Sequence, residues 1–279
     1  MTLVTIILLS LGGAILGALV ALIGFRTVEG RRMGRIWRSL ELEKSGGMDF
    51  AESLVQDLPS PVQRYFRHTI SPGAPIYCRV SLKMSGKIKA GQNSPWMRFT
   101  AAQILTPHRG FVWKARAWKG PVFLEVTDHY TQGTGHMRVA LFGLVPIVNA
   151  TGPDLSQSAL GRLMAESILV PSSLLPQKGV TWEAEDSNHI KLTLITEGEV
   201  ATLNLAINDQ GGLQQVVLER YGNQTDTGEW AYIPFGMQVD GERTVDGYTI
   251  PSQFEGGWWY GTERYTESIQ FTIEEAVFS

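Results

Sequence analysis

The feature that most constrains this chain is an uncharged apolar stretch at its amino terminus, over residues 3–25. A helix of about 20 apolar residues is long enough to cross the hydrocarbon core of a bilayer. A cleaved signal peptide would instead combine a basic leading region with an apolar stretch of only about 7–15 residues. The sequence therefore predicts a retained single-pass transmembrane anchor over residues 1–26, with the lipid bilayer as the partner of residues 3–25.

A basic segment follows the anchor over residues 27–47, and we expect it to form a helical neck that ends at Gly46 and Gly47. The basic side chains that follow the apolar stretch are Arg26, Arg31, Arg32, Arg35, Arg38 and Lys44. No basic side chain precedes the anchor, so the positive-inside rule places the carboxyl-terminal domain in the cytoplasm. The same side chains can also lie against anionic lipid headgroups.

Small residues recur at every fourth position of the anchor, at Gly13, Gly17 and Ala21. A stripe of this kind lets two membrane helices approach closely. A homodimer through this stripe is one interpretation; the other is that small residues are simply common in membrane helices.

The remainder of the chain, residues 48–279, is predicted to be one α+β domain built mainly from antiparallel strands. After a short helix with Pro61 at its first position, apolar and polar residues alternate from about Ile76 onward. Tight turns, such as those at residues 209–212 and 246–247, join successive strands and imply antiparallel order. We expect roughly ten strands in one curved, half-barrel-like sheet, because a large antiparallel sheet curls as it twists.

One segment near the middle of the chain breaks the alternation. Residues 153–169 carry apolar residues at helical spacing, and Pro171 ends the pattern. We expect this helix to cover the concave face of the sheet. Arg162 and Glu166 are four residues apart and therefore neighbours beside its apolar stripe. They are either an exposed ion pair or a polar anchor for a ligand or for the sheet.

Residues 108–146 concentrate aromatic, basic and histidine side chains, but strand geometry divides them. Successive side chains of a strand point to opposite faces. Phe111 and Trp113 are therefore predicted to face a core or a cavity, whereas Lys114 and Arg116 face outward. In the same way, the consecutive Trp258 and Trp259 are expected on opposite faces of a strand, as in a wall between a core and a pocket.

A metal site and a familiar catalytic site are not expected. Asp128 and His129 are adjacent on a strand, so only one of them can approach His136, and two ligands do not complete a zinc site. The sequence lacks the hydrolase nucleophile elbow, the zinc-protease motif, the phosphate-binding loop and the dinucleotide fingerprint. We therefore predict no catalytic residue and no cofactor, and an enzyme is the less favoured class.

The composition argues against two further classes of protein. Charged residues make up 18% of the chain and its formal net charge is −3, so it lacks the concentrated positive charge that nucleic-acid binding requires. Cys78 is the single cysteine, which excludes an internal disulfide framework and any zinc module built on two or more cysteines.

Several strings occur together at a characteristic spacing. They are "LPSPVQRY", "FTAAQ", "RGFVWKARAW", "DHYTQGTGHM", "LFGLVPIVNATGP", an R-x3-E-x4-P-x2-LLP pattern that begins at Arg162, and "GVTWE". Together they resemble an uncharacterised family of bacterial single-pass membrane proteins with a domain of unknown function, over about residues 58–273. The resemblance implies a bacterial inner-membrane location and supplies no catalytic residues.

The layout also resembles the half-barrel of lipoprotein-localisation factors, and the "TVDGYTIPSQFE" hairpin is the local feature most like them. In that group, helices close the concave side of a curved antiparallel sheet around an apolar cavity. Those carriers work on the periplasmic side, so this resemblance makes a periplasmic domain the alternative to the cytoplasmic one.

These observations favour a membrane-tethered module that binds a lipid or another apolar molecule in a half-barrel cavity. We expect its lining to be Phe111, Trp113, Met137, Leu141, Leu163, Met164 and Trp258 or Trp259, with Arg162 and Glu166 at a polar rim. One alternative is a structural or assembly protein whose concavity is filled by its own side chains. The other is an enzyme acting on a lipid-like substrate, with Asp128, His136 or Glu166 as acid or base.

Overall fold

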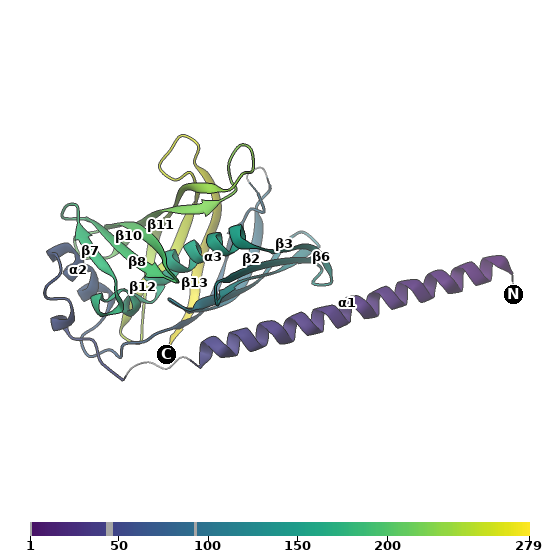
Figure 1. The fold of residues 1–279 in the computed structure, drawn as a ribbon, viewed down its shortest axis with the longest axis horizontal. Coiled ribbons are helices and arrows are strands. Elements are labelled where there is room, and N and C mark those ends of the chain that lie inside the picture. The colour runs from purple at the N-terminus through teal and green to yellow at the C-terminus, as the bar shows by residue number, and fades with distance from the viewer. Residues whose placement is uncertain (1, 43–46, 92–93) are drawn as a thin grey trace.

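A single antiparallel sheet of 13 strands dominates the computed structural model, which describes residues 2–42, 47–91 and 94–279 (Figure 1). The strands are β1 (Val80–Ile88), β2 (Met97–Thr106), β3 (Gly110–Lys119), β4 (Val122–Thr131), β5 (Thr134–Leu141), β6 (Val145–Thr151), β7 (Thr181–Ala184), β8 (His189–Thr196), β9 (Glu199–Ile207), β10 (Leu213–Gly222), β11 (Ala231–Val245), β12 (Tyr248–Trp258) and β13 (Thr266–Phe278). The helical segments are α1 (Leu3–Glu41), η1 (Glu52–Leu54), α2 (Ser60–Thr69), α3 (Pro153–Glu166), η2 (Ser167–Leu169), η3 (Pro171–Leu174) and η4 (Pro176–Lys178).

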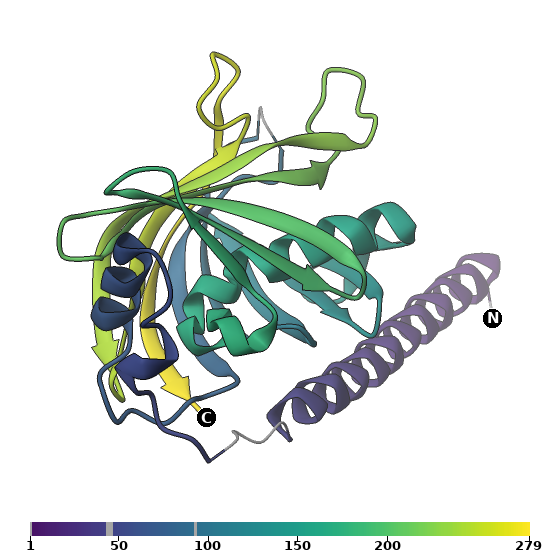
Figure 2. The ribbon, with the colours of Figure 1, turned by 60° about the vertical axis from the view of Figure 1, so that its left-hand side comes forward.

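The strands follow the chain in two runs that meet at the pairing of β1 with β13. Their order is β6-β5-β4-β3-β2-β1-β13-β12-β11-β10-β9-β8-β7, so β6 and β7 are the two edges. The sheet curls strongly, and α3 lies across its open side (Figure 2). Since α3 packs against β4 and β5 near one edge and against β8–β10 near the other, the predicted half-barrel with a covering helix is confirmed.

A glycine lets α3 approach the sheet closely. A Cβ atom on Gly135 of β5 would lie 2.9 Å from the carbonyl oxygen of Leu155 and 2.9 Å from the Cα atom of Ser156. The backbone N–H of Gly135 donates to the Ser156 hydroxyl at 2.9 Å. Gly135 therefore helps to fix where the covering helix sits.

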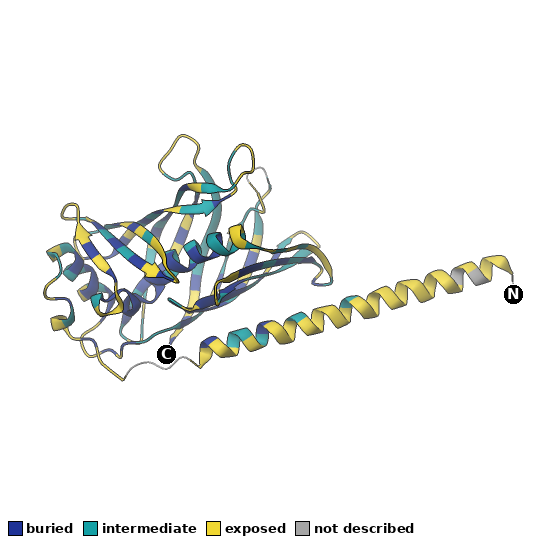
Figure 3. Cartoon of the chain, in the orientation of Figure 1, coloured by how far each residue is buried: buried dark blue, intermediate teal, exposed yellow. Residues whose placement is uncertain are grey.

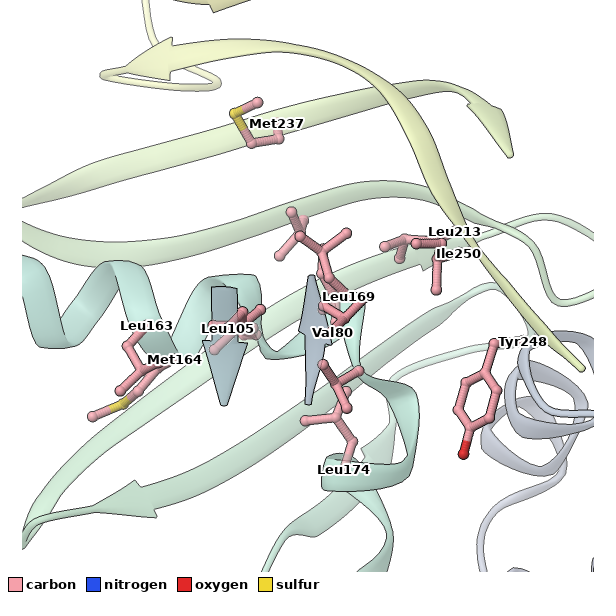
Figure 4. Packing of buried hydrophobic residues seen from close by; sticks show 14 of the residues in the cluster. Val80, Leu105, Leu163, Met164, Leu169, Leu174, Leu213, Met237, Tyr248 and Ile250 are labelled. Carbon is pink, nitrogen blue, oxygen red and sulfur yellow. The ribbon is translucent and has the colours of Figure 1, made fainter. Parts of the chain in front are cut away.

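One end of the half-barrel is closed by α2 and by the short helices that follow α3. Four residues of α2 are buried, namely Val62, Tyr65, Phe66 and Thr69. The rings of Tyr65 and Phe66 pack against Trp182 of β7 with centroid separations of 5.7 and 5.5 Å. Figure 4 shows how Leu169 and Leu174 of this region meet Val80 and Leu105 of the sheet.

The amino-terminal helix α1 is continuous from the apolar stretch into the basic segment. Its carboxyl-terminal part packs on the convex face of β2 and β3, where Leu40 joins Ile104 and Val112 in a small buried cluster. Its amino-terminal part is long and apolar enough to cross a membrane, and none of its described side chains over residues 3–25 is buried by the protein (Figure 3). The predicted end of the neck at Lys44 and Gly46 lies outside the described residues.

Two details differ from the sequence prediction. The sheet has 13 strands rather than roughly ten, and β6 was not among the strands expected from the alternation. This edge strand has no buried residue, so it lacks the alternation that marks a half-buried strand. In addition, the first residue of α2 is Ser60, and the cap is Pro59, which makes no side-chain hydrogen bond.

Candidate functional site

A cavity of about 250 Å³ lies between α3 and the concave face of the sheet, and we call it the concave cavity. Small-molecule sites commonly have volumes of about 300–1,000 Å³, so this cavity suits a slender or small molecule. Most of its wall is apolar. The apolar side chains that line it include Met84, Ile88, Trp113, Val126, Met137, Val216, Leu218, Phe235, Met237, Phe254 and Phe271.

The polar part of the wall centres on Arg162 of α3. Its Nε donates to a carboxylate oxygen of Glu166 at 2.7 Å, and its Nη1 donates to Asp128 of β4 at 2.7 Å. Gln103 of β2 donates to the other oxygen of Glu166 at 2.5 Å. The guanidinium also lies 4.6 Å from the ring centroid of Phe111. Arg162 therefore ties the covering helix to the sheet.

The charges of this cluster are complementary. Burial lowers the pKa of the Arg162 guanidinium, but the carboxylates of Glu166 and Asp128 outweigh that effect and raise it above its ordinary value. Both acids accept charge-assisted hydrogen bonds, which are stronger than neutral ones. The spacing of Arg162 and Glu166 on one helix face was visible in the sequence, whereas the contribution of Asp128 depends on the packing of α3 against β4.

A second arginine, Arg220 of β10, lines the cavity from the opposite wall. Its guanidinium lies 5.0 Å from the ring centroids of both Phe235 and Trp258. Its Nε donates to the carbonyl oxygen of Ser158 at 3.3 Å, and it has no ion pair among the residues that the structure describes. Burial, and then the positive charge of Arg162, lower the pKa of Arg220 to about 10.

Arg220 was missed in the sequence, although a signal was present. Val216 and Leu218 form the inward face of β10, and the period-2 pattern places Arg220 next on that face. A cation that continues an apolar strand face indicates either a buried partner or a ligand, and here the rings of Phe235 and Trp258 flank it.

The structure brings five of the predicted ligand-binding residues together and places the others elsewhere. Those that line the concave cavity or carry its polar cluster are Trp113, Met137, Arg162 and Glu166, with Phe111 beneath the guanidinium. Leu163 and Met164 of α3 are buried in the hydrophobic core instead. Leu141 is half-buried near the end of β5, outside the cavity lining.

The two consecutive tryptophans do not form the predicted wall. Trp258 is the last residue of β12 and packs against Phe235 with a centroid separation of 5.0 Å. Trp259 has left the strand with a φ of 59°. Its indole N–H donates to the carbonyl oxygen of Gln224 at 2.6 Å, and Arg264 lies over its ring. Strand alternation does not apply to Trp259 because the backbone turns there.

Asp128 and His129 point to opposite faces of β4, as expected, and of the two only His129 meets His136. His129 of β4 and His136 of β5 are directly paired across the strands on the convex face, 5.2 Å apart between ring centroids and both buried. Asp128 points into the concave cavity. Among the described residues, no group of three or more metal-ligating side chains is present.

Comparisons with known proteins give one family match. The model of a family of unknown function, DUF6544, matches residues 49–268. No curated protein matches the chain. The expectation of a bacterial family with a domain of unknown function is thereby confirmed.

Solved structures with related architecture are similar only at low sequence identity. One, described as an outer membrane lipoprotein-sorting protein domain from Vibrio parahaemolyticus, has 11% identity and a TM-score of 0.41, covering 78% of this chain and 91% of its own. A LolA superfamily protein from Nitrosomonas europaea has 8% identity and a TM-score of 0.43, covering 79% and 92%. A DUF1329 family protein from Desulfovibrio piger has 7% identity and a TM-score of 0.36, covering 73% and 86%.

Proposed function

The chain belongs to the DUF6544 family of unknown function, and we propose that it is a membrane-tethered module that binds a lipid or another apolar molecule in the concave cavity. The observation that carries this proposal is the cavity itself. Its wall is mostly apolar and it contains a half-buried arginine, Arg220, with no carboxylate partner among the described residues. A protein with a self-filled concavity would not need such a space.

The two walls of the cavity suit the two ends of an amphiphilic molecule. Apolar side chains such as Leu218, Met237 and Phe254 offer a surface for an acyl chain or a similar apolar body. Arg220 offers a desolvated cation, and hydrogen bonds to charged groups are stronger than neutral ones. We therefore propose that a carboxylate or phosphate head lies against Arg220 while the apolar part follows the strand face.

The apolar part of α1 supports the proposed membrane tether. A helix segment whose described apolar side chains are not buried by its own protein is unfavourable in water and favourable in a bilayer. Its basic continuation packs on the sheet, so the domain is held next to the point where the apolar stretch ends.

Exposed apolar side chains at the β5–β6 turn and on β6 lie on the part of the sheet near the end of the apolar stretch. Phe142 and Ile147 are exposed, and the ring of Phe142 packs on Phe123 of β4. Glu125, two residues after Phe123 on β4, accepts a hydrogen bond from Arg26 of α1 at 2.9 Å. This end of the sheet would therefore face the lipid headgroups.

The cavity can be tested by filling it. Ala165 is a half-buried lining residue of α3, so Ala165→Trp would place an indole in the cavity without removing a core side chain. Glu219→Trp is a matched control, because Glu219 is exposed on the outward face of β10 between Leu218 and Arg220. The full-length wild-type and variant chains would be extracted in detergent and analysed by native mass spectrometry, before and after addition of oleate.

We expect the wild-type chain and Glu219→Trp to carry or take up one lipid or oleate, and Ala165→Trp to carry none. Wild-type protein that stays ligand-free even with added oleate would contradict the proposal. Equal uptake by Ala165→Trp would show that the ligand binds elsewhere, which also contradicts it.

A further inference from the structure

A second cavity lies on the convex face of the sheet, beneath α1. It has a volume of about 230 Å³, and we call it the neck cavity. Arg26 and Glu29 of α1 form one side, and Lys114, Glu125 and Arg138 of β3–β5 form the other. The concave cavity is mostly apolar, whereas the neck cavity is lined largely by charged and polar groups.

Arg138 is the unusual member of this set. Only 7% of the residue is exposed, and its Nε and Nη2 atoms are buried with no hydrogen-bond partner in the described part of the chain. The neighbouring His136 uses Nε2 to contact Asn149 at 2.8 Å, while its Nδ1 is likewise buried and unpartnered. Burying a charged group without a partner is strongly unfavourable, so these nitrogen atoms indicate a partner from outside the described chain.

The carboxylates nearby do not supply this partner. Glu125 accepts hydrogen bonds from Arg26 and from Arg116, both at 2.9 Å. Glu29 lies 3.9 Å from Arg32. Each acid is thus already engaged by at least one arginine.

Lys114 adds a further positive charge on the sheet side of the cavity. Its Nζ lies 4.9 Å from the ring centroid of Trp37, and it has no ion pair among the described residues. Burial lowers the pKa of Lys114, an effect that Glu41 partly opposes. Arg138 and Lys114 are therefore the two cations of the neck cavity that lack a carboxylate.

We infer that the neck cavity binds a phosphate group, with Arg138 and Lys114 as its principal ligands. Phosphate offers several strong acceptor oxygens and a negative charge, which match one buried and one half-buried donor with surplus positive charge. A volume of about 230 Å³ accommodates one such group with a few waters, each of which occupies roughly 30 Å³.

The position of the cavity favours a lipid headgroup as the source of the phosphate. The Arg138 guanidinium lies 5.4 Å from the ring centroid of Phe25, the last residue of the apolar stretch, and Arg26 follows directly. If residues 3–25 cross the bilayer, this level is that of the headgroups. The choice of source rests on the proposed tether, whereas the phosphate site itself does not.

The experiment uses the full-length chain in detergent, as wild type and with Ala165→Trp to block the concave cavity. Native mass spectrometry would follow titration with phosphatidylglycerol, with phosphatidylcholine and, separately, with inorganic phosphate. Arg138→Gln is the main variant, and Lys114→Gln tests the same site from a less buried position in case the first variant does not fold. Arg31→Gln is the matched control, because Arg31 is an exposed arginine of α1 that does not line the neck cavity.

We expect phosphatidylglycerol to bind more tightly than phosphatidylcholine, and Arg138→Gln to weaken it by about tenfold or more, since a hydrogen bond to a charged group accounts for that factor. Arg31→Gln should change it little. If inorganic phosphate binds and Arg138→Gln weakens it as much as it weakens phosphatidylglycerol, the site is supported and is assigned to a soluble anion. No binding of any probe, or equal affinity in the wild-type, Arg138→Gln and Lys114→Gln chains, would overturn the inference.

The two proposals fail independently in this design. Oleate uptake that Ala165→Trp leaves unchanged, together with phosphatidylglycerol binding that Arg138→Gln weakens, leaves only the neck cavity supported. If Arg138→Gln does not weaken phosphatidylglycerol or phosphate binding, and Ala165→Trp abolishes oleate uptake, only the proposed function is supported.

Discussion

The two faces of strands β3–β5 are covered by different helices, and their buried charges differ accordingly. On the concave face, α3 brings Arg162 to Asp128, and each charged group there has an opposite partner. On the convex face, α1 covers His129, His136 and Arg138, each of which has at least one buried nitrogen atom without a hydrogen-bond partner among the described residues. The charges of α3 thus complement those of the sheet, whereas α1 leaves buried donors of the sheet without a partner. The convex face is therefore where we infer an external partner.

The same contrast separates the two walls of the concave cavity. Arg162 holds two carboxylates within 2.7 Å, whereas Arg220 is held by aromatic rings and one carbonyl oxygen. Since an unpaired buried charge is costly, the first arginine has a structural role, and the second suits a ligand. The predictions that follow test this contrast, beginning with the largest expected effect.

The largest effect is expected from Arg162→Met. This substitution leaves Asp128 and Glu166, whose side chains are 18% and 23% exposed, without their cation. Removing one partner of a buried ion pair typically costs about 3–5 kcal/mol. Urea unfolding of the full-length chain should therefore show a fall of that size in the free energy of unfolding.

The matched control replaces all three groups by neutral ones, as Arg162→Met with Asp128→Asn and Glu166→Gln. Because no charge is then left unpaired, most of the lost stability should return. If Arg162→Met alone stays within about 1 kcal/mol of the wild type, the network does not hold α3 on the sheet.

The next effect concerns the convex face and depends on pH. Burial, with smaller contributions from His136 and Arg32, lowers the pKa of His129 to about 4 from its ordinary value of 6.5. Between these values the unfolded chain binds a proton that the folded chain does not, so stability is fully present above pH 6.5 and is lost as the pH falls towards 4. The loss should reach about 3 kcal/mol, since one pKa unit corresponds to about 1.4 kcal/mol.

His129→Gln isolates this contribution, because glutamine does not titrate. The difference in unfolding free energy between pH 7 and pH 4.5 should be smaller in the variant than in the wild type. Carboxylates that titrate in the same range are common to both chains and cancel. An identical pH dependence in the two chains would mean that His129 is accessible to protons in the folded state.

The sequence was sufficient for the elements whose burial follows a regular period. The apolar residues at 155, 159, 160, 163, 164 and 168 predicted the covering helix, and all of them are buried except Leu155, which is half-buried. Alternation with tight turns predicted the antiparallel sheet and its curvature, because these depend on local pattern and on the intrinsic twist of strands. The separation of Asp128 from His129 followed for the same reason.

Features that depend on contacts between distant segments were not predicted. Residues far apart in the chain meet where Arg162 pairs with Asp128, where α1 packs on β3, and in the neck cavity around Arg138. Sequence spacing cannot show which helix covers which strand face. The exposed edge strand β6 was missed because it buries no face.

An intermediate effect is expected where α3 rests on β5. Gly135→Ala would bring a methyl group to within 2.9 Å of the α3 backbone, so the helix or the strand must shift. Overpacking of this kind usually costs about 1–3 kcal/mol. Ser156→Ala is the comparison, since it removes only the hydrogen bond from Gly135 and should cost about 1 kcal/mol. Thermal unfolding of both variants measures the difference, and equal small losses would mean that the close approach is not required.

The smallest effect on stability is expected from Arg220→Met, although its effect on ligand binding should be large. The substitution removes a cation that has no carboxylate partner among the described residues, and methionine can pack between Phe235 and Trp258. The free energy of unfolding should stay within about 1 kcal/mol of the wild type, in contrast to Arg162→Met. Affinity for oleate should fall by about tenfold or more, because a hydrogen bond to a charged group is worth about 1.5–3 kcal/mol.

The control ligand for this variant is oleyl alcohol, which has the same chain without the carboxylate. Its affinity should be unchanged by Arg220→Met if the arginine recognises the head and the apolar wall holds the chain. A marked loss of stability in Arg220→Met would give Arg220 the structural role argued for Arg162 and would remove the contrast between the two walls. A preserved fold with equal loss for both ligands would instead mean that Arg220 shapes the cavity rather than binds the charge.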